Sequence, residues 1–318
     1  MPSRAQIHAT LTTLPTGPPL VIAIIGGTSG IGSYTAKAFA SVYRNAGSKL
    51  RVYLVGRDAS RAEALLTDVR STSPGSEWRF LKANDLAMMS DVDTVCAQIK
   101  RYEEEEPFKG GGPRIDMLYM SQAFSPLAPS GRTMEDRIDA KNLPIGPPPP
   151  KKYGVTSVRT HVSFMKTYLF EALAEKHAGK ISFIHIYPGL VDGPTFLSHV
   201  NPLWFRILWR VAKVLMAWYM TSPEVCGHVM VFLGTGRYPA QGLGVGADDD
   251  KGNTKSDKEG NDVAFSSMRE RGGGAYAVGQ RGDEKKEVSY AKLRQSDTRD
   301  RVWKHTMGVL EGVQGLTR

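Results

Sequence analysis

The stretch that decides the fold spans residues 20–32 and reads LVIAII (20–25) followed by GGTSGIG (26–32). Six apolar residues in a row are typical of a strand that is buried on both faces of a parallel sheet. After the glycine-rich stretch, residues 31–46 carry apolar side chains at helical spacing. A strand, a glycine turn and a helix in this order let the backbone approach a diphosphate at the N-terminus of the helix. The sequence therefore predicts a nucleotide site here.

The same alternation of apolar and amphipathic stretches continues along the chain. It predicts strands at 50–55, 78–83, 115–120, 181–187 and 275–278, and helices at 59–70, 91–105 and 157–176. Strands that alternate with helices predict an α/β fold with a doubly wound parallel sheet in three layers. A length of 318 residues suits one large domain, with two small ones as the less favoured alternative.

Composition shifts suggest boundaries around this domain. We expect an N-terminal extension at 1–19, the sheet domain at 20–240 and a C-terminal strand and helix at 275–318. The intervening residues 241–274 are rich in Gly, Asp and Lys. They offer too little apolar area to offset the entropy of ordering, so we predict a disordered insertion.

The overall composition excludes several classes of protein. The net charge is +9, but the basic residues lack aromatic interleaving, so we expect no nucleic-acid partner. Two cysteines cannot supply a disulfide framework, and the seven histidines show no metal-ligand spacing, so no metal site is expected. The N-terminus does not read as a secretory signal, which makes the cytoplasm the expected compartment.

Several motifs together resemble the short-chain dehydrogenase/reductase family, over about residues 20–235. The glycine turn resembles that family's cofactor motif, residues 84–86 (Asn-Asp-Leu) resemble its Asp-Leu pair, and residues 188–191 (Pro-Gly-Leu-Val) resemble its Pro-Gly turn. The resemblance implies a Rossmann fold that binds NAD or NADP. It implies cofactor contacts from Gly26, Thr28, Ser29, Gly30, Ile31 and Gly32 at the diphosphate, from Asp85 at the adenine, and from Pro188, Gly189, Val191 and Thr195 near the nicotinamide.

The end of the second strand bears on the choice of cofactor. Proteins that use NAD usually place Asp or Glu there, whereas a 2′-phosphate needs a cation. Here the strand ends at Gly56 and Arg57 follows, and an arginine can donate two hydrogen bonds to a phosphate. We therefore predict NADP rather than NAD. The alternatives are that Arg57 is a solvated loop residue and that Asp58 faces a ribose.

The catalytic part of the family pattern is incomplete. The family uses a Tyr, a Lys four residues later and a Ser on the fifth strand, but none of the 12 tyrosines here has Lys four residues on. Tyr153 is nearest to the family's position and is our candidate proton donor, although Ser157 stands where the Lys is expected. The alternative is that Tyr153 is a loop or cap residue.

The interval before Tyr153 is also short. Only 32 positions separate Ser121 from Tyr153, and prolines occupy much of that stretch. A crossover helix with a further parallel strand does not fit there, so we expect the sheet to lack one strand. Either a strand has been lost in nature or the sequence lacks a segment. A deletion would leave an unfilled slot in the sheet, unless strand 181–187 pairs directly with 115–120.

Residues 202–220 are strongly apolar but carry Arg206, Arg210 and Lys213. Three cations make a membrane crossing costly. A lid over a hydrophobic substrate is the favoured interpretation, and contact with a membrane surface is the less favoured one.

These observations predict an NADP-dependent oxidoreductase that acts on an apolar ketone or secondary alcohol in secondary or lipid metabolism. The alternative is a catalytically silent or truncated nucleotide-binding relative. Whether the chain forms a homo-oligomer is left open by the sequence.

Overall fold

The computed structural model describes residues 2–109, 111–122, 155–197, 201–216, 218–243, 262–285, 294 and 297–315. The chain forms two compact units. Pro2–Leu127 and Pro188–Gly234 make up one, which we call the large-sheet unit. Ala128–Tyr187 and Thr235–Arg318 make up the other, which we call the small-sheet unit.

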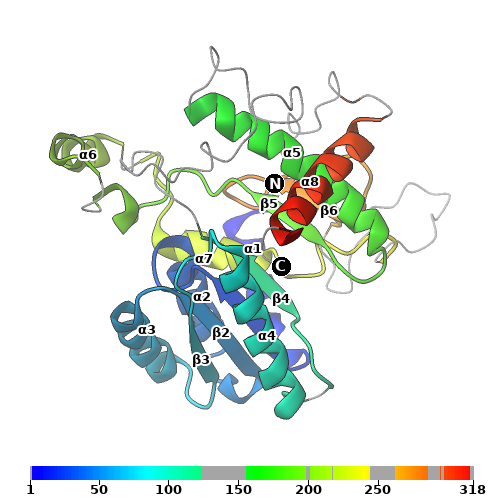
Figure 1. The fold of residues 1–318 in the computed structure, drawn as a ribbon. Helices are drawn as coiled ribbons and strands as arrows, with labels where there is room; N and C mark the ends of the chain where they lie inside the picture. Colours follow the sequence, from blue (N-terminus) through cyan, green and yellow to red (C-terminus); the bar gives the residue numbers. More distant parts are fainter. Residues whose placement is uncertain are drawn as a thin grey trace. The chain divides into compact units, whose positions relative to one another are not determined.

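The large-sheet unit is built on four parallel strands in the order β3-β2-β1-β4 (Figure 1). The strands are β1 (Leu20–Ile25), β2 (Leu50–Gly56), β3 (Glu77–Lys82) and β4 (Met117–Met120). The chain runs from β1 outward to β3 and then returns to β4 on the other side of β1. This reversal of strand order is the place where open α/β sheets bind their ligands, at the carboxyl ends of the strands.

Helices cover both faces of this sheet, as the alternation of side chains along β1 requires. Val21 and Ala23 lie in one apolar cluster with side chains of α4 (Met89–Glu105). On the opposite face, α2 (Gly30–Val42) contacts β1, and Phe39 of this helix meets Tyr119 of β4 edge to face. The predicted three-layer, doubly wound α/β fold is confirmed.

This unit contains further helical elements. They are α3 (Ala59–Thr72), α6 (Leu203–Leu215), α7 (Pro223–Phe232) and the short 3₁₀ helices η1 (Leu14–Thr16), η2 (Gly47–Lys49) and η5 (Pro194–Leu197). The extension before β1 forms α1 (Arg4–Thr13), which begins at a capping box between Ser3 and Gln6. Ile7 and Leu11 are buried and α1 packs against α7, so this segment is part of the unit.

The small-sheet unit contains α5 (Val155–Lys176), β5 (Phe183–Ile186), β6 (Ala275–Val278) and α8 (Thr298–Gly315). The two strands pair in parallel, and α5 packs against both of them and against α8. The strand predicted at 181–187 therefore pairs with β6, and not with 115–120. Residues 123–154, where the family's next strand is expected, lie outside the described residues.

Part of the predicted disordered insertion 241–274 is ordered. Val263 and Ala264 are 1% and 0% exposed, and Ser267 donates a hydrogen bond of 2.6 Å to the buried Glu171. The prediction is wrong for residues 262–274, because a short apolar group and one buried acceptor are enough to anchor them. Composition averaged over the whole stretch concealed this anchor.

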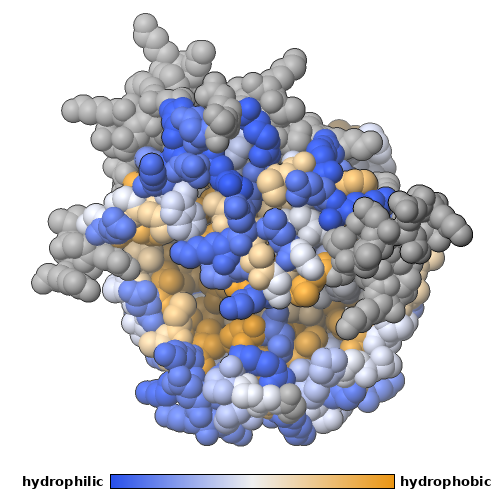
Figure 2. All heavy atoms as spheres, turned by 90° about the vertical axis from the view of Figure 1, so that its right-hand side faces the viewer, coloured by the Kyte–Doolittle hydropathy of each residue, from blue (hydrophilic) through white to orange (hydrophobic). Residues whose placement is uncertain are grey.

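Some apolar side chains remain at the surface. Figure 2 shows hydrophobic residues among hydrophilic ones on the face that it draws. In and just before β4, Ile115 is 39%, Leu118 58% and Met120 69% exposed. In the described part of the chain, no helix is both long enough and apolar enough to cross a membrane.

Candidate functional site

The glycine turn between β1 and α2 is held in place by the neighbouring strand. The backbone N–H groups of Gly26 and Gly27 both donate to the carbonyl of Val55, at 2.9 Å each. Gly26 has φ 76° and Gly30 has φ 54°. Both lie in the left-handed region, which glycine adopts without the penalty that a Cβ would bring.

The residues that follow β4 press against the same turn from the other side. A Cβ at Gly26 would lie 2.7 Å from the backbone N of Gln122, and one at Gly32 would lie 2.5 Å from Oγ of Ser121. The Ser121 hydroxyl is positioned to donate to the carbonyl of Ile25 at 2.9 Å and to that of Gly26 at 3.2 Å. The turn is thus clamped between β2 and the end of β4, with space for backbone only.

The helix that follows this turn begins without a side-chain cap. Ser29 is the N-cap of α2 and is extended, with φ −157°, but its side chain makes no capping hydrogen bond. The first N–H groups of an α-helix have no partner within the helix. The first N–H groups of α2 are therefore available to bind an anion. Because the glycines of the turn have no Cβ, a diphosphate can approach the backbone closely. Thr28 packs against Gly56 at the end of β2. A Cβ on Gly56 would lie 2.5 Å from the methyl group of Thr28.

Arg57 and Asp58 follow β2 but differ in what surrounds them. Arg57 is exposed, and no ion pair to it is found within the described part of the chain. Asp58 is the N-cap of α3: its carboxylate accepts from the backbone N–H of Arg61 at 3.0 Å and lies 3.1 Å from Nε of the same residue. Asp58 is therefore engaged in starting a helix. The prediction that Arg57 meets a 2′-phosphate and the alternative in which Asp58 faces a ribose both stay predictions, since 43% of the Asp58 side chain is exposed.

Asp85 lies just beyond the end of β3. Its carboxylate accepts a hydrogen bond from the backbone N–H of Ala87 at 3.0 Å, and its own N–H donates to Asp91. The residue as a whole is half-buried. Because the four strands are parallel, Asp85 shares one edge of the sheet with the glycine turn and Arg57.

The segment predicted to flank a nicotinamide is fixed to α2. Gly189 has φ 76°, and Thr221 and residues 190–192 exchange backbone hydrogen bonds of 2.9 and 3.1 Å around the bridge between Val191 and Thr221. The hydroxyl of Tyr34, one turn into α2, donates to the carbonyl of Asp192 at 3.1 Å. Burial, together with Asp192, raises the pKa of Tyr34, so this hydroxyl stays a protonated donor.

Two of the predicted site residues cannot be assigned a geometry. Thr195 lies in η5 with its side chain outside the described residues, and Tyr153 lies outside them altogether. Tyr119, at the end of β4, is buried and donates to the carbonyl of Met230 at 3.1 Å, and burial raises its pKa. It is therefore held as a structural donor.

Sequence reasoning missed Tyr34, and it used Ser121 only to measure the interval before Tyr153. Their contacts join positions 158 and 95 residues apart in the chain. The one available signal is the position of Ser121 directly after a strand.

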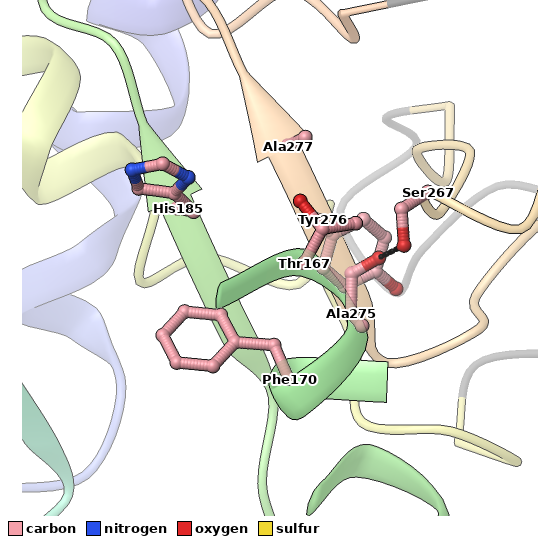
Figure 3. A pocket seen from close by; sticks show the side chains of 7 residues that line it. All are labelled: Thr167, Phe170, His185, Ser267, Ala275, Tyr276 and Ala277. Atoms are coloured by element: carbon pink, nitrogen blue, oxygen red, sulfur yellow. Dashed lines mark hydrogen bonds between the residues drawn. The ribbon is translucent and has the colours of Figure 1, made fainter. Parts of the chain in front are cut away.

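A second cluster of polar groups lies in the small-sheet unit. Figure 3 shows a narrow space between α5 and the strands, lined by Thr167, Phe170, His185, Ser267, Ala275, Tyr276 and Ala277. The side chains leave no room for a water molecule, so the space is a packing gap. Burial, with a smaller effect of Lys166, lowers the pKa of His185 to about 4, which keeps the imidazole neutral.

Comparison with known proteins gives three similarities along nearly the whole chain, although no model of a protein family matches it. The short-chain dehydrogenase/reductase SAT2 of Stachybotrys chartarum is 40% identical over an alignment of 357 residues that covers 98% of each chain. Oxidoreductase andH of Emericella variicolor is 26% identical, over 99% of this chain and 98% of its own.

Solved structures are more distant. L-sorbose reductase from Gluconobacter frateurii, complexed with NADPH and L-sorbose, is 18% identical with a TM-score of 0.47, over 69% of this chain and 90% of its own. The RhlG/NADP complex of Pseudomonas aeruginosa is 15% identical with a TM-score of 0.47, over 71% and 91% of the two chains.

The alignment with the Stachybotrys protein also contains positions that this chain lacks. It has 357 positions, whereas this chain has 318 residues, so at least 39 positions of the relative have no counterpart here. Because 98% of both chains is covered, these positions fall inside the alignment and not at its ends.

Proposed function

Because the chain belongs to the short-chain dehydrogenase/reductase family of oxidoreductases, we propose that it binds NADP in the large-sheet unit and reduces an apolar ketone or oxidises the corresponding secondary alcohol. The observation that carries the proposal is the clamped glycine turn, where Gly26 and Gly32 leave no room for a Cβ and α2 begins without a side-chain cap. We place the reaction in secondary or lipid metabolism.

Each part of the proposed site has one task. The backbone of 26–32 binds the diphosphate, Asp85 binds the adenine, and Val191 and Thr195 flank the nicotinamide. When bound, the cofactor supplies the hydride acceptor or donor. Tyr153 exchanges the proton with the substrate oxygen.

The preference for NADP follows from the end of β2. Exposed Arg57 has its guanidinium available for a 2′-phosphate, while Asp58, the nearest carboxylate, is engaged by Arg61. A ribose 2′-hydroxyl would find no free acidic partner at these two positions.

An apolar substrate is supported by the residues that follow the nicotinamide segment. Phe196 stacks on the buried Trp209 with ring centroids 4.1 Å apart, and Phe205 lies beside Trp209 at 6.4 Å. Phe196 of this aromatic cluster lies close to Val191 in sequence, and the apolar character of the segment suits an apolar carbonyl compound.

Calorimetric titration with NADPH and NADH tests the cofactor site. We expect NADPH to bind at least about tenfold more tightly, because a charged hydrogen bond to phosphate contributes more than 1.4 kcal/mol. Arg57→Ala should reduce NADPH binding to the NADH level. Arg44→Ala, an exposed arginine beyond the far end of α2, should leave both affinities unchanged. Absence of heat with either dinucleotide for a folded sample would refute the proposal.

A second candidate is a relative that binds the nucleotide without turnover. The shortfall of at least 39 positions against the Stachybotrys protein, together with the absent Tyr–Lys spacing, favours it. NADPH oxidation with a panel of hydrophobic ketones separates the two candidates. Turnover that Tyr153→Phe abolishes supports the enzyme, whereas NADPH binding without turnover supports the silent relative.

A further inference from the structure

Helix α6 has an inner face that is anchored within the large-sheet unit. Trp209 is only 8% exposed and stacks between Phe196 and Phe205. These rings fix the rotation of the helix about its axis. The residues on the opposite side consequently face outward.

That outer face is apolar along the whole helix. More than half of the surface of each member is exposed: Leu203, Trp204, Ile207, Leu208, Val211, Val214 and Leu215. At 3.6 residues per turn they occupy an arc of about 140°. Just after the helix, Trp218 is 87% and Tyr219 54% exposed. Soluble monomers rarely leave an apolar surface of this extent uncovered, so it marks a contact site.

Cations border this face on one side. On the helical wheel Arg206, Arg210 and Lys213 lie between the inner and the outer face. Lys213 pairs with Asp192 at 2.8 Å, and Arg210 is exposed. The sequence has no Asp or Glu between Gly193 and Pro223. The surface therefore complements a partner that is both apolar and negatively charged.

We propose that α6 binds the surface of an anionic membrane, lying in its plane with the outer face in the lipid. The helix has 13 residues and is about 20 Å long, which is too short to span a hydrocarbon core of about 30 Å. Trp204 near its start and Trp218 and Tyr219 after its end are the residue types that settle at the lipid–water boundary. The exposed Arg210 then reaches anionic headgroups at the same depth.

This arrangement also argues against a second copy of the chain as the occupant. If two copies joined through their outer faces, Arg206 and Arg210 of one copy would lie near the same residues of the other. The segment has no acidic residue that could neutralise these positive charges. A lipid surface provides the counter-charge instead. The proposal is independent of the cofactor site, because none of its residues holds the nucleotide.

Sedimentation of the full chain with lipid vesicles tests the proposal. Vesicles of phosphatidylcholine alone are compared with vesicles that also contain phosphatidylserine. We expect binding to the anionic vesicles and much weaker binding to the neutral ones. Leu208→Glu combined with Val211→Glu should weaken binding by about a hundredfold or more, and Arg210→Glu by about tenfold. Val309→Glu on α8 is the matched control, since Val309 is 51% exposed against 57% and 58% for the two test positions.

Tryptophan emission gives a second readout on the same samples. Trp204 and Trp218 are the most exposed of the five tryptophans, so insertion should shift the emission to the blue for the wild-type chain and for Val309→Glu. Binding that is absent, that is equal on neutral and anionic vesicles, or that survives the double substitution would overturn the proposal. So would a dimer in light scattering that the double substitution converts to monomer, which would assign the face to a second copy.

Discussion

At Gly26, two separate requirements fall on one residue. The backbone is left-handed, with φ 76°. In addition, the residues that follow β4 come so close that a Cβ on Gly26 would lie 2.7 Å from the backbone N of Gln122. A left-handed conformation alone costs a residue with a Cβ about 1 kcal/mol. The close approach adds a displacement of the turn itself, which is where the diphosphate is proposed to bind.

We therefore expect Gly26→Ala to lose NADPH binding by more than about a hundredfold and to lower stability by several kcal/mol. Gly75→Ala is the matched control, because Gly75 has φ 82° but a Cβ there would meet nothing closer than 3.6 Å. It should cost about 1 kcal/mol and leave NADPH affinity intact. Calorimetry and urea unfolding measure the two effects; equal losses in both variants would show that the close approach is unimportant.

His185 provides a second prediction for a single residue. Burial, followed by the charge of Lys166, lowers the pKa of His185 to about 4 in the folded chain, against about 6.5 when unfolded. The unfolded state therefore binds more protons between these two values. Stability of the small-sheet unit should fall as the pH drops from about 6.5 to 4, by up to roughly 3 kcal/mol from this residue.

Urea unfolding at several pH values, monitored by circular dichroism, measures this slope. In His185→Leu the slope should be clearly smaller, whereas replacing exposed His8 of α1 by Leu should not change it. A slope that is identical in wild type and His185→Leu would assign the acid sensitivity to other groups.

At the scale of elements, α4 is attached to β2 by a buried ion pair as well as by apolar contacts. Arg51 and Glu103 are 1% and 2% exposed, with Nη1 and Oε1 2.9 Å apart, and the Tyr53 hydroxyl donates to the same oxygen at 2.6 Å. Burial and Glu103 together raise the pKa of Tyr53. Removing the carboxylate charge leaves the buried guanidinium with two partly exposed acidic partners, Glu77 at 2.7 Å and Glu106 at 3.8 Å.

Glu103→Gln should accordingly destabilise the large-sheet unit by about 3 kcal/mol, the usual cost of leaving a buried charge without its partner. Glu104→Gln removes the neighbouring carboxylate, which is 52% exposed and 3.7 Å from Lys100, and should cost less than about 0.5 kcal/mol. Urea unfolding monitored by circular dichroism distinguishes them. Similar midpoints for the two variants would contradict the role given to this pair.

Most elements were predictable because their signals are local. Residues 20–25 are apolar throughout and form β1, which pairs in parallel with β2. The glycine turn follows β1 directly in sequence and in space. The clamp on that turn was not predictable, since Ser121 and Tyr34 act over separations of 95 and 158 residues. Residues 262–274 escaped prediction for a similar reason: the partner of Ser267 is Glu171, on a distant helix.

For the molecule as a whole, the edge of the large sheet is a weak point. Within the described residues β4 pairs only with β1, and Leu118 and Met120 are exposed. The expected absence of the family's next strand stays a prediction, supported by the 39 or more positions missing relative to the Stachybotrys protein. An apolar strand edge invites pairing with other chains.

Leu118→Lys should therefore slow aggregation severalfold on mild heating, because a charge on an edge strand opposes intermolecular pairing. Leu243→Lys, at a position that is 50% exposed in the small-sheet unit, is the control and should aggregate like the wild type. Light scattering at fixed protein concentration measures both. Unchanged aggregation of Leu118→Lys would place the association elsewhere on the molecule.

The engagement of Asp58 at the start of α3 constrains how the coenzyme preference could be redesigned. Recruiting that carboxylate to a ribose would deprive the helix of its first-turn acceptor, at a cost of about 1 kcal/mol, and would detach Arg61. A protein engineer seeking a form that accepts NADH would do better to install the acid at position 57 itself. Replacing Arg57 alone, with Asp58 kept as the cap of α3, would change the coenzyme preference without destabilising the helix.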